Sequence, residues 1–234
     1  YIKAIDLNQK YSIAYYNRAN VYQKLKKYDA SLQDYQKAID LNPNSWSVFY
    51  NQGNLLRIMK QYEAAVQSYD SSISLNPVVA EPYCNKAISL YELSKYHVAL
   101  ENYNMALHLK SDYAEAHYNR GACLEKLKQL EAALESYEKA FELNPEIDYL
   151  LGIKLQLKLS LCDWSNLEET LALCAVGINA QKPTVGSFTA LVLFDNPQLH
   201  LMSAKAHVSN QFSSDPSLGA IPKRELRARV RIGY

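Results

Sequence analysis

Large and small apolar positions recur along the chain at a fixed spacing. A shift of 34 residues superposes Tyr1, Tyr35, Tyr69, Tyr103 and Tyr137 with no insertion or deletion between them. The same shift aligns a small residue three positions later and a leucine six positions later in every copy. A constant period of this length is the sequence signature of a repeat array. We therefore divide the chain into repeats that begin at Ser12, Trp46, Ala80 and Ala114.

Each copy predicts two antiparallel helices. Small residues occupy the eighth position, at Ala19, Gly53, Ala87 and Gly121, and again the twentieth, at Ser31, Ala65, Ala99 and Ala133. Helices can cross closely only where side-chain volume is small, so these positions mark the helix contacts. The second helix is expected to open at Tyr28, Tyr62, Tyr96 and Leu130, and Pro43, Pro77 and Pro145 are expected to follow its end. Because one hairpin cannot bury its apolar faces alone, neighbouring hairpins must stack.

These signature positions resemble the tetratricopeptide family from residue 1 to about residue 147. The resemblance implies an all-α right-handed superhelix of helical hairpins, with a C-terminal helical extension. The expected units are the second half of an incomplete repeat at 1–11, four repeats at 12–45, 46–79, 80–113 and 114–147, a helical capping or linker region at 148–212, and at 213–234 a linker with the first strand of a truncated downstream domain.

After residue 147 the period is lost. The apolar run from Leu150 to Leu161 fits a strand or a buried helix, and its position after a helical array favours the helix. Asp163 to Asn166 and Asn196-Pro197 indicate helix starts, whereas Pro183 and Gly186 interrupt the pattern. Val230 and Ile232 alternate with arginines before Tyr234, which predicts a strand.

This second part of the chain is similar to bacterial members of the O-linked N-acetylglucosamine transferase and SPINDLY-type family. The similarity lies in Tyr149-Leu-Leu-Gly, Leu161-Cys-Asp-Trp164, Asp195-Asn-Pro197 and Arg229-Val-Arg-Ile-Gly-Tyr234. It implies that the repeats are the substrate-recruiting arm of an intracellular glycosyltransferase that uses a nucleotide sugar. The catalytic residues of that family would lie downstream, so none is assigned here. The alternative is a stand-alone adaptor or co-chaperone-type module with no attached enzyme.

One asparagine recurs at the sixth position of each repeat. Stacking should align these residues along the concave face, where the resembling transferases also carry asparagines. An amide both donates and accepts hydrogen bonds, so a line of amides can hold an extended peptide backbone. Asparagines, tyrosines and an arginine on the same helix faces are expected to join this surface. The predicted peptide-binding residues are Asn17, Asn51, Asn85, Asn119, Asn20, Asn54, Tyr16, Tyr50, Arg57, Tyr91 and Tyr118.

Two alternatives stay open for these residues. The asparagines could brace adjacent helices with no ligand, and individual tyrosines could simply pack between repeats. A third mode, in which chaperone-adaptor repeats grip a C-terminal acidic peptide, is disfavoured. Tyrosines and Cys84 occupy the fifth position where that mode uses lysine, and Glu81 and Glu115 would repel a carboxylate.

Composition narrows the remaining functions. A formal net charge of +1 disfavours nucleic acid as a partner, and no apolar stretch is long enough for a membrane span. Four cysteines without a CxxC pair predict free thiols, no metal site and a cytoplasmic location. His200 and His207 lack a third ligand. The expected partner is a protein or peptide, no cofactor is expected in this chain, and self-association through exposed repeat ends is left open.

Overall fold

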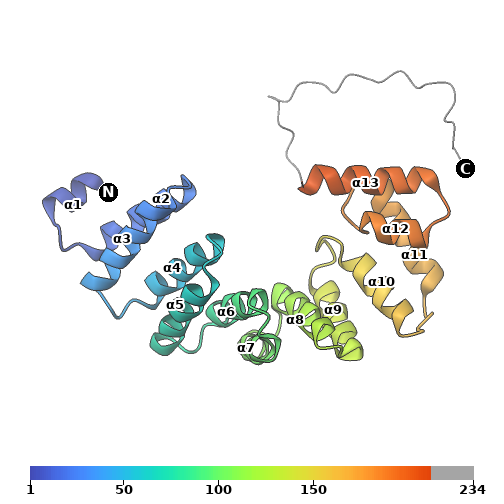
Figure 1. The fold of residues 1–234 in the computed structure, drawn as a ribbon, viewed down its shortest axis with the longest axis horizontal. Coiled ribbons are helices and arrows are strands. Elements are labelled where there is room, and N and C mark those ends of the chain that lie inside the picture. Colours follow the sequence, from blue (N-terminus) through green and yellow to red (C-terminus); the bar gives the residue numbers. More distant parts are fainter. Residues whose placement is uncertain (212–234) are drawn as a thin grey trace, which may run out of the picture.

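The computed structural model describes residues 1–211, and it describes their side chains as far as residue 209. Within this range the chain is helical throughout and bends into a shallow curve (Figure 1). The predicted linker and strand at 213–234 lie outside the described residues. None of the described helices is both long and apolar enough to cross a membrane.

The repeat region is a series of helical hairpins. A short helix, α1 (Ile2–Leu7), precedes the pairs α2 (Ser12–Lys24) with α3 (Tyr28–Leu41), α4 (Trp46–Ile58) with α5 (Tyr62–Leu75), α6 (Ala80–Glu92) with α7 (Tyr96–Leu109), and α8 (Ala114–Lys126) with α9 (Leu130–Leu143). The second helices open at the four residues that the sequence predicts. In Figure 1, α4 and α6 lie on the inside of the curve, and α5 and α7 lie on the outside.

The turn inside each hairpin places a non-glycine residue in the left-handed region. These residues are Lys26, Lys60, Ser94 and Lys128, with φ between 57° and 60°. The amide that follows each of them donates to a carbonyl five residues earlier; the Lys27 to Tyr22 bond is 2.9 Å long. This bond closes a Schellman motif, which satisfies carbonyls that the end of the first helix would otherwise leave unpaired.

The recurrent tyrosines form the centre of each hairpin. Tyr35, Tyr69, Tyr103 and Tyr137 are almost fully buried. A Cβ added to Gly53 would lie 2.7 Å from the Tyr69 ring, and one added to Gly121 would lie 2.7 Å from the Tyr137 ring. The small eighth position therefore exists because the ring of the second helix packs directly against the first helix.

The segment after the repeats is a compact helical unit on the end of the array. It comprises α10 (Leu150–Ser160), α11 (Leu167–Asn179), α12 (Ser187–Leu193) and α13 (Pro197–Gln211). Leu150 and Leu157 of α10 pack in one core cluster with Tyr137 of the last repeat. The apolar run is thus a buried helix, and α13 begins at the predicted Pro197.

Glycines let the segment between α11 and α12 cross the neighbouring helices closely. The Gly152 amide donates to the Thr184 carbonyl at 3.1 Å, and a Cβ on Gly177 would come within 2.0 Å of Thr184 Oγ1. The sequence indicated only an interruption here and did not predict α12.

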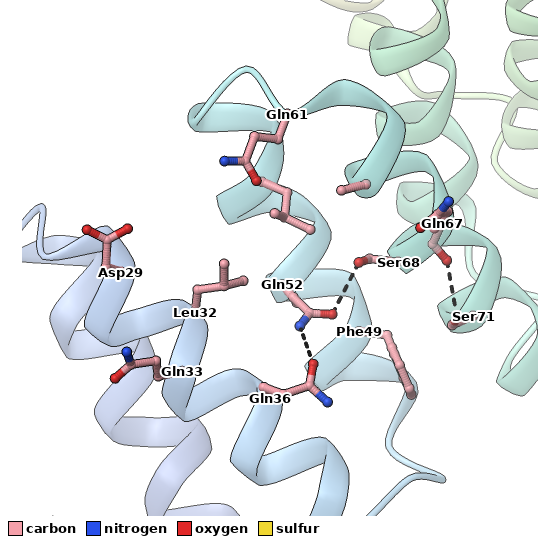
Figure 2. Close-up of a pocket in the computed structure, with 12 residues that line it drawn as sticks. Asp29, Leu32, Gln33, Gln36, Phe49, Gln52, Gln61, Gln67, Ser68 and Ser71 are labelled. Atoms are coloured by element: carbon pink, nitrogen blue, oxygen red, sulfur yellow. Dashed lines mark hydrogen bonds between the residues drawn. The ribbon is translucent and has the colours of Figure 1, made fainter.

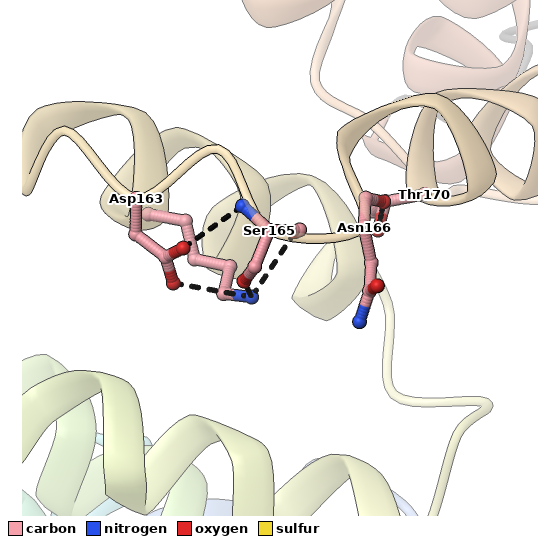
Figure 3. A network of polar contacts seen from close by, with 5 residues as sticks. Asp163, Ser165, Asn166 and Thr170 are labelled. Atoms are coloured by element: carbon pink, nitrogen blue, oxygen red, sulfur yellow. Dashed lines mark hydrogen bonds and ion pairs between the residues drawn. The ribbon is translucent and has the colours of Figure 1, made fainter.

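The turn between α10 and α11 is held by a polar network (Figure 3). Lys158 Nζ lies 3.2 Å from Asp163 Oδ2 and donates to Ser165 Oγ at 2.8 Å. The Ser165 amide donates to Asp163 Oδ1 at 2.9 Å. Hydrogen bonds from Ser165, followed by the smaller effect of Lys158, lower the pKa of Asp163. Asn166 then adopts the left-handed region, with φ 56°, directly before α11.

Candidate functional site

The predicted peptide-binding residues all lie on the first helices of the hairpins. Their sixth-position asparagines occur one each on α2, α4, α6 and α8. All eleven predicted residues are at least partly exposed except Asn85, which is 9% exposed. The structure therefore places the predicted set along one line of helices, with part of most side chains open to solvent.

Two of the asparagines make hydrogen bonds between repeats. Asn51 Nδ2 donates to Tyr16 Oη at 2.7 Å, and Asn85 Nδ2 donates to Tyr50 Oη at 3.1 Å. Asn85 Nδ2 also donates to Asn54 Oδ1 at 2.8 Å. The interpretation that the asparagines brace the array is therefore supported for these two residues, because their amides link successive first helices.

The ninth-position asparagines are occupied by the buried tyrosines. Tyr35 Oη donates to Asn20 Oδ1 at 2.6 Å, and Tyr69 Oη donates to Asn54 Oδ1 at 2.8 Å. Each bond satisfies a hydroxyl whose ring is buried in the hairpin core. The Nδ2 group of Asn20 keeps both of its donors free of side-chain hydrogen bonds among the described residues.

The other two ladder asparagines are unoccupied. Among the hydrogen bonds of residues 1–211, none involves the side chain of Asn17 or Asn119. For Asn119 the reason lies in the preceding repeat, where Cys84 replaces the tyrosine and Ile88 replaces the ninth-position asparagine. The groups that hold Asn85 are thus missing beside Asn119, and its amide is available to a ligand.

The predicted tyrosines have one face in the core and one face outside it. Tyr16, Tyr50 and Tyr118 contact the buried tyrosines of their own hairpins, with ring centroids 5.8 to 6.3 Å apart. Tyr91 lies edge-on to Tyr96 at 5.3 Å. Burial raises the pKa of Tyr50, Tyr91 and Tyr118. These rings are fixed by packing, yet all three remain partly exposed.

Arg57 lies beside the central tyrosines. Its Nε atom is buried and has no hydrogen-bond partner in the described part of the chain. Burial raises the pKa of Tyr69, and the Arg57 charge opposes that rise. The guanidinium therefore lies close to the Tyr69 ring while its charge has no acidic partner within the described residues.

A hollow of about 490 Å³ lies between the first two repeats. Asn20 and Asn51 line it, together with four residues that the sequence reasoning did not select: Gln23, Lys24, Tyr28 and Ile58. Gln23 and Lys24 follow Asn20 by about one helical turn, and this spacing could have identified them. The hollow thus combines amides, a cation and apolar surface.

Acidic residues approach the concave face further along the array. Burial raises the pKa of the Cys84 thiol to about 12, and the nearby Glu115 carboxylate adds to that rise, with a smaller contribution from Glu81. Glu81 lies 3.9 Å from Lys110, both of them well exposed. The Cys84 thiol is fully buried and protonated at neutral pH, so it offers no nucleophile.

The histidines considered for metal binding are engaged elsewhere. His200 Nε2 lies 2.6 Å from the Phe194 carbonyl oxygen, and His207 Nδ1 lies 3.3 Å from Tyr149 Oη. No group of three or more potential metal ligands occurs within residues 1–211.

Comparison with known proteins agrees with this geometry. A model described as tetratricopeptide repeat matches residues 12–45 and 114–147, a TPR repeat model matches 87–128, and a further tetratricopeptide model matches 34–67. Together these ranges cover half of the chain. Among curated protein sequences no match is found.

Solved structures share the fold at low sequence identity. YrrB, described as a TPR protein with an unusual peptide-binding site, is 20% identical, with a TM-score of 0.63 over 87% of this chain and 97% of YrrB. MamA from Desulfovibrio magneticus RS-1 is also 20% identical, with a TM-score of 0.63 over 69% of this chain and 91% of MamA. At these identities the likeness concerns the fold. The chain belongs to the tetratricopeptide-repeat family.

Proposed function

We propose that the chain is a scaffold that binds an extended peptide or protein segment along its concave face. The observation that carries the proposal is the row of partly exposed amides, in which Asn119 and Asn17 make no side-chain hydrogen bond and Asn20 and Asn51 line a hollow. A peptide backbone needs donors and acceptors at regular intervals, and an amide supplies both. YrrB, described as having a peptide-binding site, shares this fold.

The charges of the concave face suggest how the ligand is oriented. Lys24 and Arg57 lie in the first two repeats, whereas Glu81 and Glu115 lie in the next two. Opposite charges attract most strongly where the surrounding side chains exclude water. We therefore expect a ligand with acidic residues against the first two repeats and basic residues against the last two.

A peptide array on the full chain tests this proposal. Short peptides of neutral, acidic, basic and mixed charge would be compared for binding to the wild type, to Asn119→Ala and to Glu131→Ala. Glu131 is an exposed residue at the start of α9 and serves as the control. Removing an amide that pairs with a peptide backbone should weaken binding about tenfold or more, because the backbone group is left unsatisfied. Equal binding to all three proteins would refute the proposal.

The resemblance of residues 149–234 to the transferase family supports a more specific role. In this role the array recruits protein substrates in the cytoplasm for an O-linked N-acetylglucosamine transferase-like enzyme. The motif at 229–234 lies outside the described residues, so this role rests on sequence alone. A reading frame that continues beyond Tyr234 into a two-lobed α/β domain would support it, and a stop codon there would favour the stand-alone adaptor.

A further inference from the structure

On the outer face of the array, the seventh residue of a repeat usually bridges helices. The bridges are Arg18 Nε to Asp34 Oδ2 at 2.7 Å, Lys86 Nζ to Asp70 Oδ1 at 2.6 Å, and Arg120 to Asn104 Oδ1 at 2.8 Å and Ser136 Oγ at 2.6 Å. All three are short and involve a long cationic side chain. By helical spacing, this seventh position points away from the concave side chains of the fifth and ninth positions.

The second repeat carries glutamine at this position. Gln52 Nε2 reaches Gln36 Oε1 only at 3.4 Å, and Ser68 Oγ donates to Gln52 Oε1 at 3.2 Å (Figure 2). Gln52 is shorter than arginine and carries no charge, so it spans the space between α3 and α5 less completely. A groove of about 800 Å³ is open here, a volume typical of ligand sites.

The groove has apolar floor groups and amide walls. Leu32, Phe49 and Leu56 provide apolar surface between α3 and α5 (Figure 2). The side chains of Gln33, Gln61 and Gln67 make no hydrogen bond within residues 1–211, so their amides are available on both walls. Among the lining residues Asp29 alone carries a charge, and it lies at the start of α3.

We propose that this outer groove is a second binding site, which takes an extended polypeptide segment of a partner protein. The segment places an apolar side chain against Phe49 and Leu56 and pairs its backbone with the glutamine amides. The near absence of charge in the lining selects against an acidic segment, because Asp29 repels it and no cation compensates. This site is separate from the concave face, since the two use opposite sides of α4.

The neighbouring repeats supply the design that closes the groove. The double substitution Gln52→Arg with Ser68→Asp copies the Arg18 and Asp34 pair, in which arginine lies along Tyr15 and Tyr22 at 5.5 and 5.7 Å from the ring centroids. In the second repeat the same arrangement covers Phe49 and Leu56. Asn51→Ala, on the opposite side of α4, is the matched control. Circular dichroism on all variants checks that the fold is kept.

The probe is a displayed library of short random peptides, selected on the full wild-type chain. The proposal expects a class of non-acidic peptides that loses about tenfold or more in affinity in the double variant and in Gln33→Ala with Gln67→Ala, but not in Asn51→Ala. If every selected peptide binds the double variant as well as the wild type, the outer site does not exist. Peptides that respond only to concave-face substitutions would support the concave site and overturn the outer one. Wild-type self-association that the double variant abolishes would identify a second copy as the occupant and also overturn the proposal.

Discussion

Asn85 and Asn119 occupy the same position in successive repeats, so their replacement by alanine isolates the hydrogen bonds that only one of them makes. Asn85 donates to Tyr50 Oη and to Asn54 Oδ1 and is 9% exposed. Asn119 makes no side-chain hydrogen bond among the described residues. We predict that Asn85→Ala destabilises the fold and that Asn119→Ala does not.

The magnitude follows from these contacts. A net contribution of about 1 kcal/mol per hydrogen bond gives a loss of about 2 kcal/mol for Asn85→Ala. Alanine favours a helix interior over asparagine by roughly 0.5 kcal/mol, and this gain applies equally to both variants. The difference in unfolding free energy between the two variants should therefore be about 2 kcal/mol, with Asn119→Ala neutral or slightly stabilising.

Urea unfolding of the full chain, followed by circular dichroism, measures this difference. Hydrogen exchange of amides in α6 and α8 would show whether the loss is local to the repeat, as expected when each repeat contacts only its neighbours. A difference below about 0.5 kcal/mol, or a larger loss for Asn119→Ala, would refute the reasoning that Asn85 braces the array while Asn119 is free.

Three further predictions test the packing. Cys162 is exposed whereas Cys84, Cys123 and Cys174 are buried, so alkylation of the native chain followed by mass spectrometry should label Cys162 first; rapid labelling of Cys84 would contradict its burial. Burial raises the pKa of Cys84 to about 12 and of Cys123 and Cys174 to about 11; a raised folded-state pKa favours the protonated thiol, so stability should be fully present below pH about 9 and fall as pH rises towards 11 and 12, and a urea midpoint unchanged over that window would count against it. Gly177→Ala places a Cβ 2.0 Å from Thr184 Oγ1 and should destabilise the C-terminal unit by about 1–3 kcal/mol, whereas the control Gly186→Ala meets nothing closer than 3.7 Å; similar thermal midpoints for the two would show that Thr184 moves aside without cost.

The sequence predicted the hairpins well because their contacts are local and repeat. A tyrosine ring in the second helix requires a small residue in the first helix, and both recur every 34 residues. It did not predict the left-handed residues Lys26 and Ser94, since the Schellman hydrogen bonds hold that conformation without glycine. It also missed α12, a short helix between Gly186 and Phe194 with too few residues to show a period.

The candidate site was predictable in its position but not in its hydrogen bonds. Helical spacing places Asn51 and Asn85 on one line, but their partners depend on how far successive helices are displaced along their axes. That displacement brings the Asn85 amide to Tyr50 and Asn54, and no single-repeat pattern specifies it. The outer groove was missed for a related reason, because its opening depends on Gln52 being shorter than its counterparts in three helices packed together.

The central claim is that the concave face holds an extended peptide through its free amides. Side-chain amide resonances of the full chain, recorded by nuclear magnetic resonance during titration with an array-selected peptide, test it most directly. The account predicts that the Asn119 resonances shift in a saturable manner and that the shifts are lost with Asn119→Ala. Saturable binding that leaves the resonances of Asn17, Asn20, Asn51 and Asn119 unchanged would contradict it.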